Sequence, residues 1–222
     1  MDKNIIHLYI DGKWDVEDFA DFLKTYLQIY YLFNSLFTEK YSIDNERINY
    51  AYSLFPWKGG YSAVNFYQQL KFAIPKKDRP KITAIHFSSP GYIELLLLSK
   101  ITEIISEIIT YVAGSIGICN GIYNKIYTDM QKRKLLRLKI KRKELRLDQE
   151  KIKLDNIILQ NSDLEFINES NEDIAQILGL GGELKELNKK TGHPYITLKI
   201  LLSLYRRIRT LAGYEKNNKL KL

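Results

Sequence analysis

The sequence predicts an α+β fold, in which a small antiparallel sheet with covering helices is followed by a carboxyl-terminal half made of a long helix and a helical bundle. Two β-rich runs occur, at residues 5–10 and 82–98. Apolar residues recur at helical spacing between these runs and through most of the chain after residue 100. With 45% hydrophobic and 27% charged residues, the composition is that of a globular protein and excludes wholesale disorder.

The first predicted strand, Ile5–Ile10, ends at the turn pair Asp11-Gly12. Asp15 then offers an N-cap, and two acids follow in the first turn, where the helix dipole favours them. Apolar residues recur every three or four positions from there, so we expect a long amphipathic helix from Asp15 to Phe37.

The segment 41–75 is rich in aromatic residues and is interrupted by Pro56 and Gly59-Gly60. Arg47–Phe55 is compatible with a strand. Gly60–Ala73 fits a short helix better, because its apolar residues are three or four apart.

The strongest β signal lies between Lys81 and Leu98. The tetrapeptide Ser88-Ser89-Pro90-Gly91 divides it, with a proline that fixes φ and a glycine that can adopt positive φ. We expect a hairpin whose second strand is deeply apolar, although the run after Gly91 could also open a helix.

Ile101–Tyr127 is predicted to be an apolar helix. It contains the glycines Gly114, Gly117 and Gly121, which suit close helix packing, including packing within a membrane. A core helix, an oligomer interface and a membrane segment all remain open, and one continuous helix fits the pattern as well as two packed helices.

Residues 125–160 predict a long helix with two narrow apolar stripes. One stripe repeats every seven residues, and the second lies two positions further on, about 200° around the helix. Such a helix needs a partner on each side, as in a bundle or a higher oligomer. The predicted oligomer interface is the first stripe: Leu138, Leu145, Ile152 and Leu159.

The last sixty residues predict a small helical region. Asn161–Ser170 is polar and is expected to be a loop. Three short helices follow, over 171–180, 182–190 and 195–212, and Leu178–Gly182 is expected to cap the first of them. The tail from Lys216 is expected to fray. The predicted organisation is therefore an α+β interaction domain (1–100), the apolar and basic helices (101–160) and a small helical region (161–222).

The charge balance points to anionic partners. The net charge is +8, with 34 Lys and Arg against 26 Asp and Glu. A basic run follows the apolar helix and provides the predicted anion or lipid contacts: Lys132, Arg133, Lys134, Arg137, Lys139, Lys141, Arg142, Lys143 and Arg146. It could be a solvated helix face, a contact with an anionic membrane or a nucleic-acid site. Residues 131–161 contain no aromatic side chain for base stacking, so nucleic acid is the weaker partner.

The sequence offers no set of catalytic, cofactor-binding or metal-ligating residues. His86 near Ser88 and Ser89 lacks the flanking motif of a nucleophile and its base. Cys119 lies among apolar and small residues, which predicts inert burial. Glu103 and Glu107 are one helical turn apart without a third ligand and are expected to be surface charges. We therefore expect no enzyme and no cofactor.

The strand, the long helix and the stretch ITAIHFSSPGYIELLLL together resemble the amino-terminal domain of the TRADD adaptor and its predicted bacterial relatives. The matching residues are Ile5–Ile10, the helix from Asp15, and Ile82–Leu98. The resemblance implies a short antiparallel sheet covered by helices and an interaction module without catalytic residues. It also implies a role in immunity or regulated cell death, in some members next to a membrane-associated segment.

Together these features predict a non-enzymatic signalling, effector or adaptor protein of a bacterial immunity or cell-death system. It would oligomerise with itself or bind a protein partner through its helical half. The start of the chain lacks the pattern of a signal peptide, so a cytoplasmic location is expected, either free or at the inner face of the membrane. The alternative is a nucleic-acid-binding regulator that uses the predicted basic helix 131–146.

Overall fold

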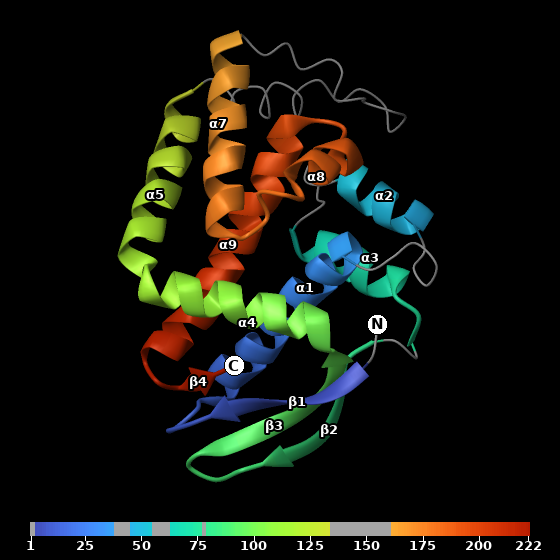
Figure 1. The fold of residues 1–222 in the computed structure, drawn as a ribbon, viewed down its shortest axis with the longest axis vertical. Coiled ribbons are helices and arrows are strands. Elements are labelled where there is room, and N and C mark those ends of the chain that lie inside the picture. The colour runs from blue at the N-terminus through green and yellow to red at the C-terminus, as the bar shows by residue number, and fades with distance from the viewer. Residues whose placement is uncertain (1–2, 38–44, 55–62, 77–78, 134–160) are drawn as a thin grey trace.

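The computed structural model describes residues 3–37, 45–54, 63–76, 79–133 and 161–222. A four-stranded antiparallel sheet lies at one end of the molecule, and the described helices are stacked above one of its faces (Figure 1). The α+β prediction is therefore confirmed.

The strands are β1 (Lys3–Ile10), β2 (Lys81–His86), β3 (Gly91–Leu98) and β4 (Leu220–Lys221), in the order β2-β3-β1-β4. β1 and β3 pair along their whole length, from Lys3 opposite Leu98 to Ile10 opposite Gly91. This order and these directions follow the β-α-β-β-α-β pattern, with the second crossover enlarged into most of the helical part of the chain.

The inner face of the sheet forms one side of the core. Its buried side chains alternate along β1 and β3, with Leu8 and Ile10 next to Ile93 and Leu95. The long helix α1 (Val16–Phe37) and the central helix α9 (Pro194–Lys216) continue the same core. This hydrophobic cluster contains residues from all three predicted segments, 1–100, 101–160 and 161–222.

The predicted hairpin forms as β2 and β3. The expected role of Gly91, however, was wrong, because Gly91 is not among the glycines with positive φ. A Cβ atom there would lie 2.5 Å from the carbonyl oxygen of His86 and 2.8 Å from that of Ser88. Gly91 is therefore needed for close approach of the backbone.

The strand proposed for Arg47–Phe55 is wrong, since the chain forms helix α2 (Asn45–Leu54) there. Ile48, Ala51 and Tyr52 are buried at positions three and four apart, which is the helical period. The short helix expected before Ala73 is present as α3 (Ala63–Ala73). The aromatic composition favoured a strand, but burial against the core decided for a helix.

The apolar segment after the sheet forms two helices, α4 (Ser99–Gly114) and α5 (Ile116–Lys132), bent by 91° at Ser115. The Ser115 hydroxyl donates to the Tyr111 carbonyl at 2.6 Å, a bond that competes with helix continuation. Within the described chain, Gly114, Gly117 and Gly121 serve no close packing, because nothing beyond the helix's own backbone lies within 4 Å of a Cβ position there.

The loop predicted for Asn161–Ser170 is also wrong, because α7 (Asn161–Ile177) begins there. Ile167, Ser170, Asn171 and Ile174 are buried along one side, so a helical stripe exists although half of it is polar. The predicted cap is confirmed: the Leu180 amide donates to the Ala175 carbonyl and the Gly179 amide to that of Gln176, with Gly179 at φ 63°.

The remaining elements are α8 (Leu184–Thr191) and α9, which begins after the N-cap His193. The chain end expected to fray is instead β4, which pairs with β1 through Leu220 opposite Ile10. Leu220 is only 3% exposed, so burial of its side chain explains why the tail is held.

Candidate functional site

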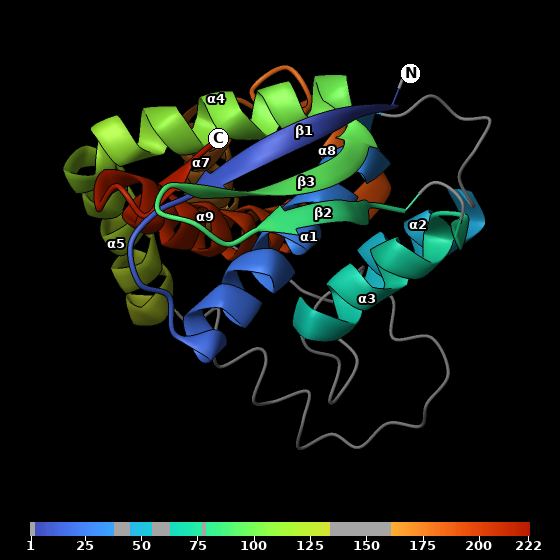
Figure 2. The same ribbon diagram turned by 90° about the horizontal axis from the view of Figure 1, so that it is seen from below.

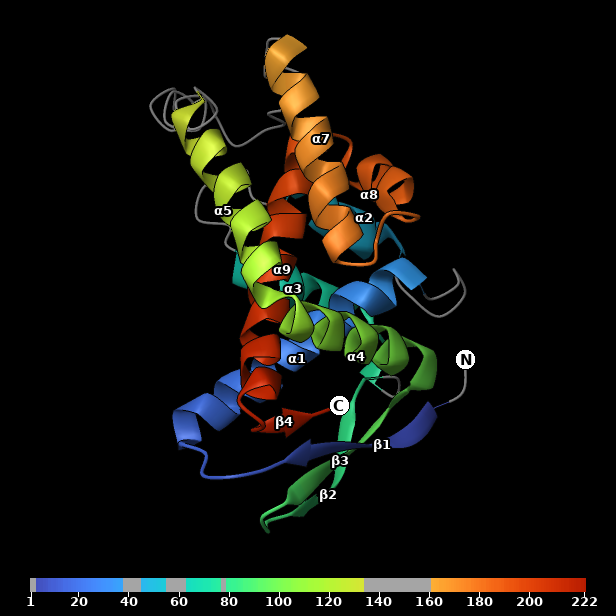
Figure 3. The same ribbon diagram turned by 60° about the vertical axis from the view of Figure 1, so that its left-hand side comes forward.

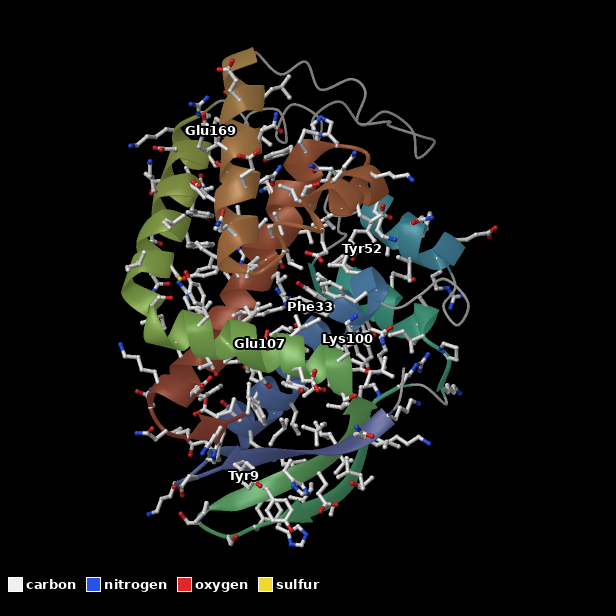
Figure 4. The ribbon with its side chains drawn as sticks, viewed as in Figure 1. Tyr9, Phe33, Tyr52, Lys100, Glu107 and Glu169 are labelled. Atoms are coloured by element: carbon white, nitrogen blue, oxygen red, sulfur yellow. The ribbon has the colours of Figure 1, made fainter. Side chains whose placement is uncertain are left out.

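One face of the sheet carries no described helix. Figure 2, which looks at the molecule from below, shows the strands in front of the helices. Figure 4 shows Tyr9 on this side, pointing away from the helical layer. We call this surface the outer sheet face; cross-strand pairing assigns to it Ile5, His7, Tyr9, Lys81, Ala84, His86, Tyr92, Glu94, Leu96 and Lys221.

Aromatic and imidazole rings make up the row nearest the hairpin turn. Across the strands this row reads Lys221, Tyr9, Tyr92 and His86. The His86 ring stacks on Tyr92 with centroids 4.3 Å apart and an interplanar angle of 25°, and the Tyr9 centroid lies 6.2 Å from that of Tyr92. Tyr9 is 46% exposed, so its ring is accessible to a ligand.

A polar row crosses the middle of the outer sheet face. His7 lies opposite Glu94, with 3.2 Å between His7 Nε2 and Glu94 Oε1, and its ring contacts Tyr92 with centroids 4.9 Å apart. The Thr83 hydroxyl, at an irregularity in β2, lies 3.3 Å from Glu94 Oε2 and donates to it. These contacts hold the Glu94 carboxylate within the face.

Two lysines stand at opposite margins of this surface. Lys221 lies beside Tyr9 on β4, and Lys81 lies beside Leu96 on β2. Both are exposed, and neither has an ion-pair partner among the residues that the structure describes. The margins of the outer sheet face are therefore available to an anionic ligand.

A groove of about 640 Å³ continues the outer sheet face past its Tyr9 end. Its lining includes Tyr9, Asp11, Pro90, Lys219 and Lys221. The Ser89 hydroxyl and the Gly12 amide both donate to Asp11 Oδ1, and these bonds lower the pKa of the Asp11 carboxyl. The hairpin turn and the chain after β1 are thus joined at the groove.

The predicted basic run lies mainly outside the described residues. Lys132, the last residue of α5, is exposed and pairs with Asp129 at 3.8 Å. Arg133 is its C-cap and donates from Nη1 to Asp163 Oδ1 at 3.0 Å. The other seven predicted anion contacts lie in 134–160, as do the four predicted interface residues Leu138, Leu145, Ile152 and Leu159.

The structure does describe the residues on either side of the segment 134–160. α5 and α7 lie side by side and extend away from the sheet (Figures 1 and 3). The Arg133 guanidinium also lies 4.3 Å from the centre of the Phe166 ring, so two contacts join the end of α5 to the start of α7. The described residues on the two sides of 134–160 are therefore neighbours, at the end of the molecule opposite the sheet.

The weak catalytic candidates occupy structural positions. His86 stacks on Tyr92, while Ser89 bonds to Asp11. Cys119 is buried on α5, with its sulfur 3.3 Å from the Ser115 hydroxyl. Glu103 and Glu107 are exposed on α4, and Figure 4 shows Glu107 on its outer side. No group of three metal-ligating side chains occurs within the described ranges.

Taken singly, none of the described helices has both the length and the apolarity needed to span a membrane. α4 and α5 meet these criteria only as a bent pair. Five apolar side chains of α4 pack into the core: Ile101, Ile105, Ile108, Ile109 and Val112.

Comparison with protein-family models, with curated proteins and with solved structures gave no match.

Sequence reasoning missed the outer sheet face. The alternation in β1 places His7 and Tyr9 on one side and Leu8 and Ile10 on the other, which is a readable signal. What the sequence could not supply was the register that places His7 opposite Glu94 and Tyr9 between two other strands.

Proposed function

We propose that this chain is a non-enzymatic adaptor or effector protein that oligomerises through residues 134–160. The observation that carries the proposal is the junction of α5 and α7, where the Arg133–Asp163 contact brings both ends of that segment together, away from the sheet. Because its flanking residues Arg133 and Asp163 already meet, a 27-residue segment at this position can engage other molecules without disturbing the core.

The composition of the segment supports this role. Nine lysines and arginines and four acids lie between residues 134 and 160, so the segment carries +5 of the net charge of +8. Its two apolar stripes recur at heptad spacing and would be costly to leave in water. Self-association covers the stripes and leaves the lysines and arginines for an anionic surface.

The wider assignment belongs to the same proposal. An adaptor role in a bacterial immunity or cell-death system is what the resemblance to the TRADD amino-terminal domain implies. The exposed aromatic residues of the outer sheet face support a binding role for the folded body as well. In this account the chain acts in the cytoplasm, and the basic run attaches it to the inner face of a membrane.

Substitution of the first stripe tests oligomerisation. Leu145→Asp combined with Ile152→Asp should lower the mass measured by light scattering, because two charges would enter an apolar interface. The control is Arg146→Gln combined with Lys153→Gln, which lowers the net charge by the same two units away from the stripes and should leave the mass unchanged. An unchanged mass in the aspartate variant would show that the stripe does not mediate assembly.

Sedimentation with vesicles tests the membrane part. Vesicles that contain an anionic phospholipid should bring the protein down at low salt and release it at high salt, since exposed charges are screened. The Arg146→Gln, Lys153→Gln variant should bind more weakly. If the protein stays with the vesicles at high salt and is released only by detergent, apolar residues are inserted into the bilayer. If the protein does not sediment with the vesicles at all, the membrane part of the proposal is wrong.

A further inference from the structure

We propose that the outer sheet face binds single-stranded nucleic acid, with bases stacked on Tyr9 and on the His86–Tyr92 pair. This site is separate from residues 134–160 and does not depend on the function proposed for that segment. It would make the sheet end of the molecule the part that recognises a ligand.

Stacking surfaces are the first requirement for such a ligand, and the outer sheet face supplies two. Tyr9 is half exposed, and His86 lies over the Tyr92 ring to form a second unit. Because His86 covers one face of Tyr92, the rings open to bases are Tyr9 and the exposed His86, on either side of Tyr92, whose centroid is 6.2 Å from that of Tyr9. Aromatic side chains on an open four-stranded sheet are a recurrent way of binding single strands.

Positive charge for the phosphates is the second requirement. Lys221 and Lys81 stand at the two margins of the face, whereas Lys219, in the groove next to Tyr9, is already paired with Asp18 at 4.0 Å. Without residues 134–160 the rest of the chain still has a net charge of +3. Lys221 lies in the same row as the rings, and Lys81 lies at the far margin, in the row of Ile5 and Leu96, so a backbone that crosses the face obliquely meets both charges.

Glu94 is the one acid that cross-strand pairing places on the face, and its chemistry is compatible with a base. Its carboxylate is held by His7 and Thr83 at the centre of the surface, between the rings and the aliphatic pair Ile5 and Leu96. Carboxylate oxygens accept hydrogen bonds from exocyclic amino groups of bases. Against a phosphate backbone the same charge is repulsive. Removal of the Glu94 charge should therefore strengthen binding, whereas removal of the Tyr9 ring should weaken it.

A single strand fits this surface better than the two other macromolecules that could cover it. A duplex keeps its bases stacked on each other and would leave the rings unused. A protein partner would also use Tyr9, but protein interfaces are depleted of lysine, and the outer sheet face carries Lys221 directly beside Tyr9. The combination of rings and marginal lysines therefore favours nucleic acid.

Fluorescence anisotropy of a labelled oligouridylate of about ten nucleotides, titrated with the full chain at low salt, tests the proposal. Tyr9→Ala should weaken binding roughly 5- to 100-fold, the equivalent of one lost stacked base. Tyr9→Phe, which keeps the ring, should bind within about twofold of the wild type. Because uracil has no exocyclic amino group for the carboxylate to accept from, Glu94→Gln should tighten binding of this probe roughly two- to fivefold, the size of one exposed charge interaction.

Two controls separate this site from general attraction to positive charge. Tyr111→Ala removes another exposed tyrosine, 59% exposed against 46% for Tyr9, from α4 and outside the outer sheet face, and should have no effect. A second control alters the basic run by Lys139→Gln, Lys141→Gln, Arg142→Gln and Lys143→Gln together. In this background, Tyr9→Ala should weaken binding by the same factor as it does in the wild type. Circular dichroism verifies that each variant is folded.

Three results would overturn the proposal. The first is absence of binding at low salt. The second is equal binding by the wild type and the Tyr9→Ala variant, together with loss in the variant of the basic run, which would place nucleic acid on residues 134–160. The third is competition by a duplex as effective as that by the single strand, which would leave the outer sheet face to a protein partner.

Discussion

Two glycines show how a single residue type serves different purposes in this fold. Gly91 closes the β2–β3 turn, and a Cβ there would meet two carbonyl oxygens. Gly121, inside α5, has open space around it. We expect Gly91→Ala to lower the free energy of unfolding by more than about 1 kcal/mol, and Gly121→Ala to raise it by roughly 0.5–1 kcal/mol. Urea unfolding of both variants measures the difference, and a tolerated Gly91→Ala would contradict the turn geometry.

Buried tyrosines give the core a dependence on alkaline pH. Burial raises the pKa of Tyr52, whose hydroxyl contacts Ser35 Oγ at 2.7 Å, and raises the pKa of Tyr195 to about 12. An unfolded tyrosine loses its proton near pH 10, while the folded one keeps it, so stability is complete below about pH 10 and falls above it.

The expected loss is up to about 1.4 kcal/mol for each such tyrosine and each pH unit. Urea unfolding between about pH 9 and pH 11 measures it. Tyr52→Phe should cost about 1 kcal/mol at neutral pH and make the alkaline decline shallower. A free energy of unfolding that stayed constant to pH 11 would contradict the burial of these hydroxyls.

At the scale of elements, the junction of α5 and α7 contains a partly buried ion pair. Arg133 is 34% exposed and Asp163 is 17% exposed, and Phe166 covers the guanidinium. A double-mutant cycle with Arg133→Ala and Asp163→Ala should give a coupling of about 1 kcal/mol that decreases with salt. The pair Lys132–Asp129, 74% and 38% exposed, is the matched control and should give almost none. Equal coupling in both pairs would contradict a special role for Arg133.

Elements with a strong local signal were predictable. The alternation and the turn residues of 81–98 predicted the β2–β3 hairpin, and the spacing of apolar residues predicted α1. α7 was missed because buried Ser170 and Asn171 interrupt its apolar stripe. β4 was missed because two residues carry no period, and only the non-local pairing of Leu220 with Ile10 makes them a strand.

The basic run and the outer sheet face also differ in how far the sequence predicts them. The lysines and arginines of 132–146 and the heptad stripes are visible in sequence, but their contacts with other molecules are not encoded in a local pattern. The outer sheet face needs three strands in register before Tyr9, Tyr92 and His86 become neighbours. A cluster built across strands has no sequence spacing of its own, which is why composition pointed only to the basic run.

At the scale of the whole molecule, the described residues share one hydrophobic core, and the contact between Arg133 and Asp163 brings the two sides of the segment 134–160 together. Replacement of residues 134–160 by about eight Gly and Ser residues, which span about 16 Å on average, should join Arg133 to Asn161 without strain. We expect this variant to keep the far-ultraviolet circular dichroism of α4, α5, α7 and α9 and to unfold cooperatively. A molten or unfolded variant would show that the segment is part of the core.

The mass of that variant beside the wild type, measured by light scattering over a range of protein concentrations, is the most direct test of the central claim. The account predicts that the wild type is larger than one chain of 26.1 kDa, and that the folded variant without residues 134–160 is a monomer. A monomeric wild type, or a variant that keeps the mass of the wild type, would contradict oligomerisation through this segment.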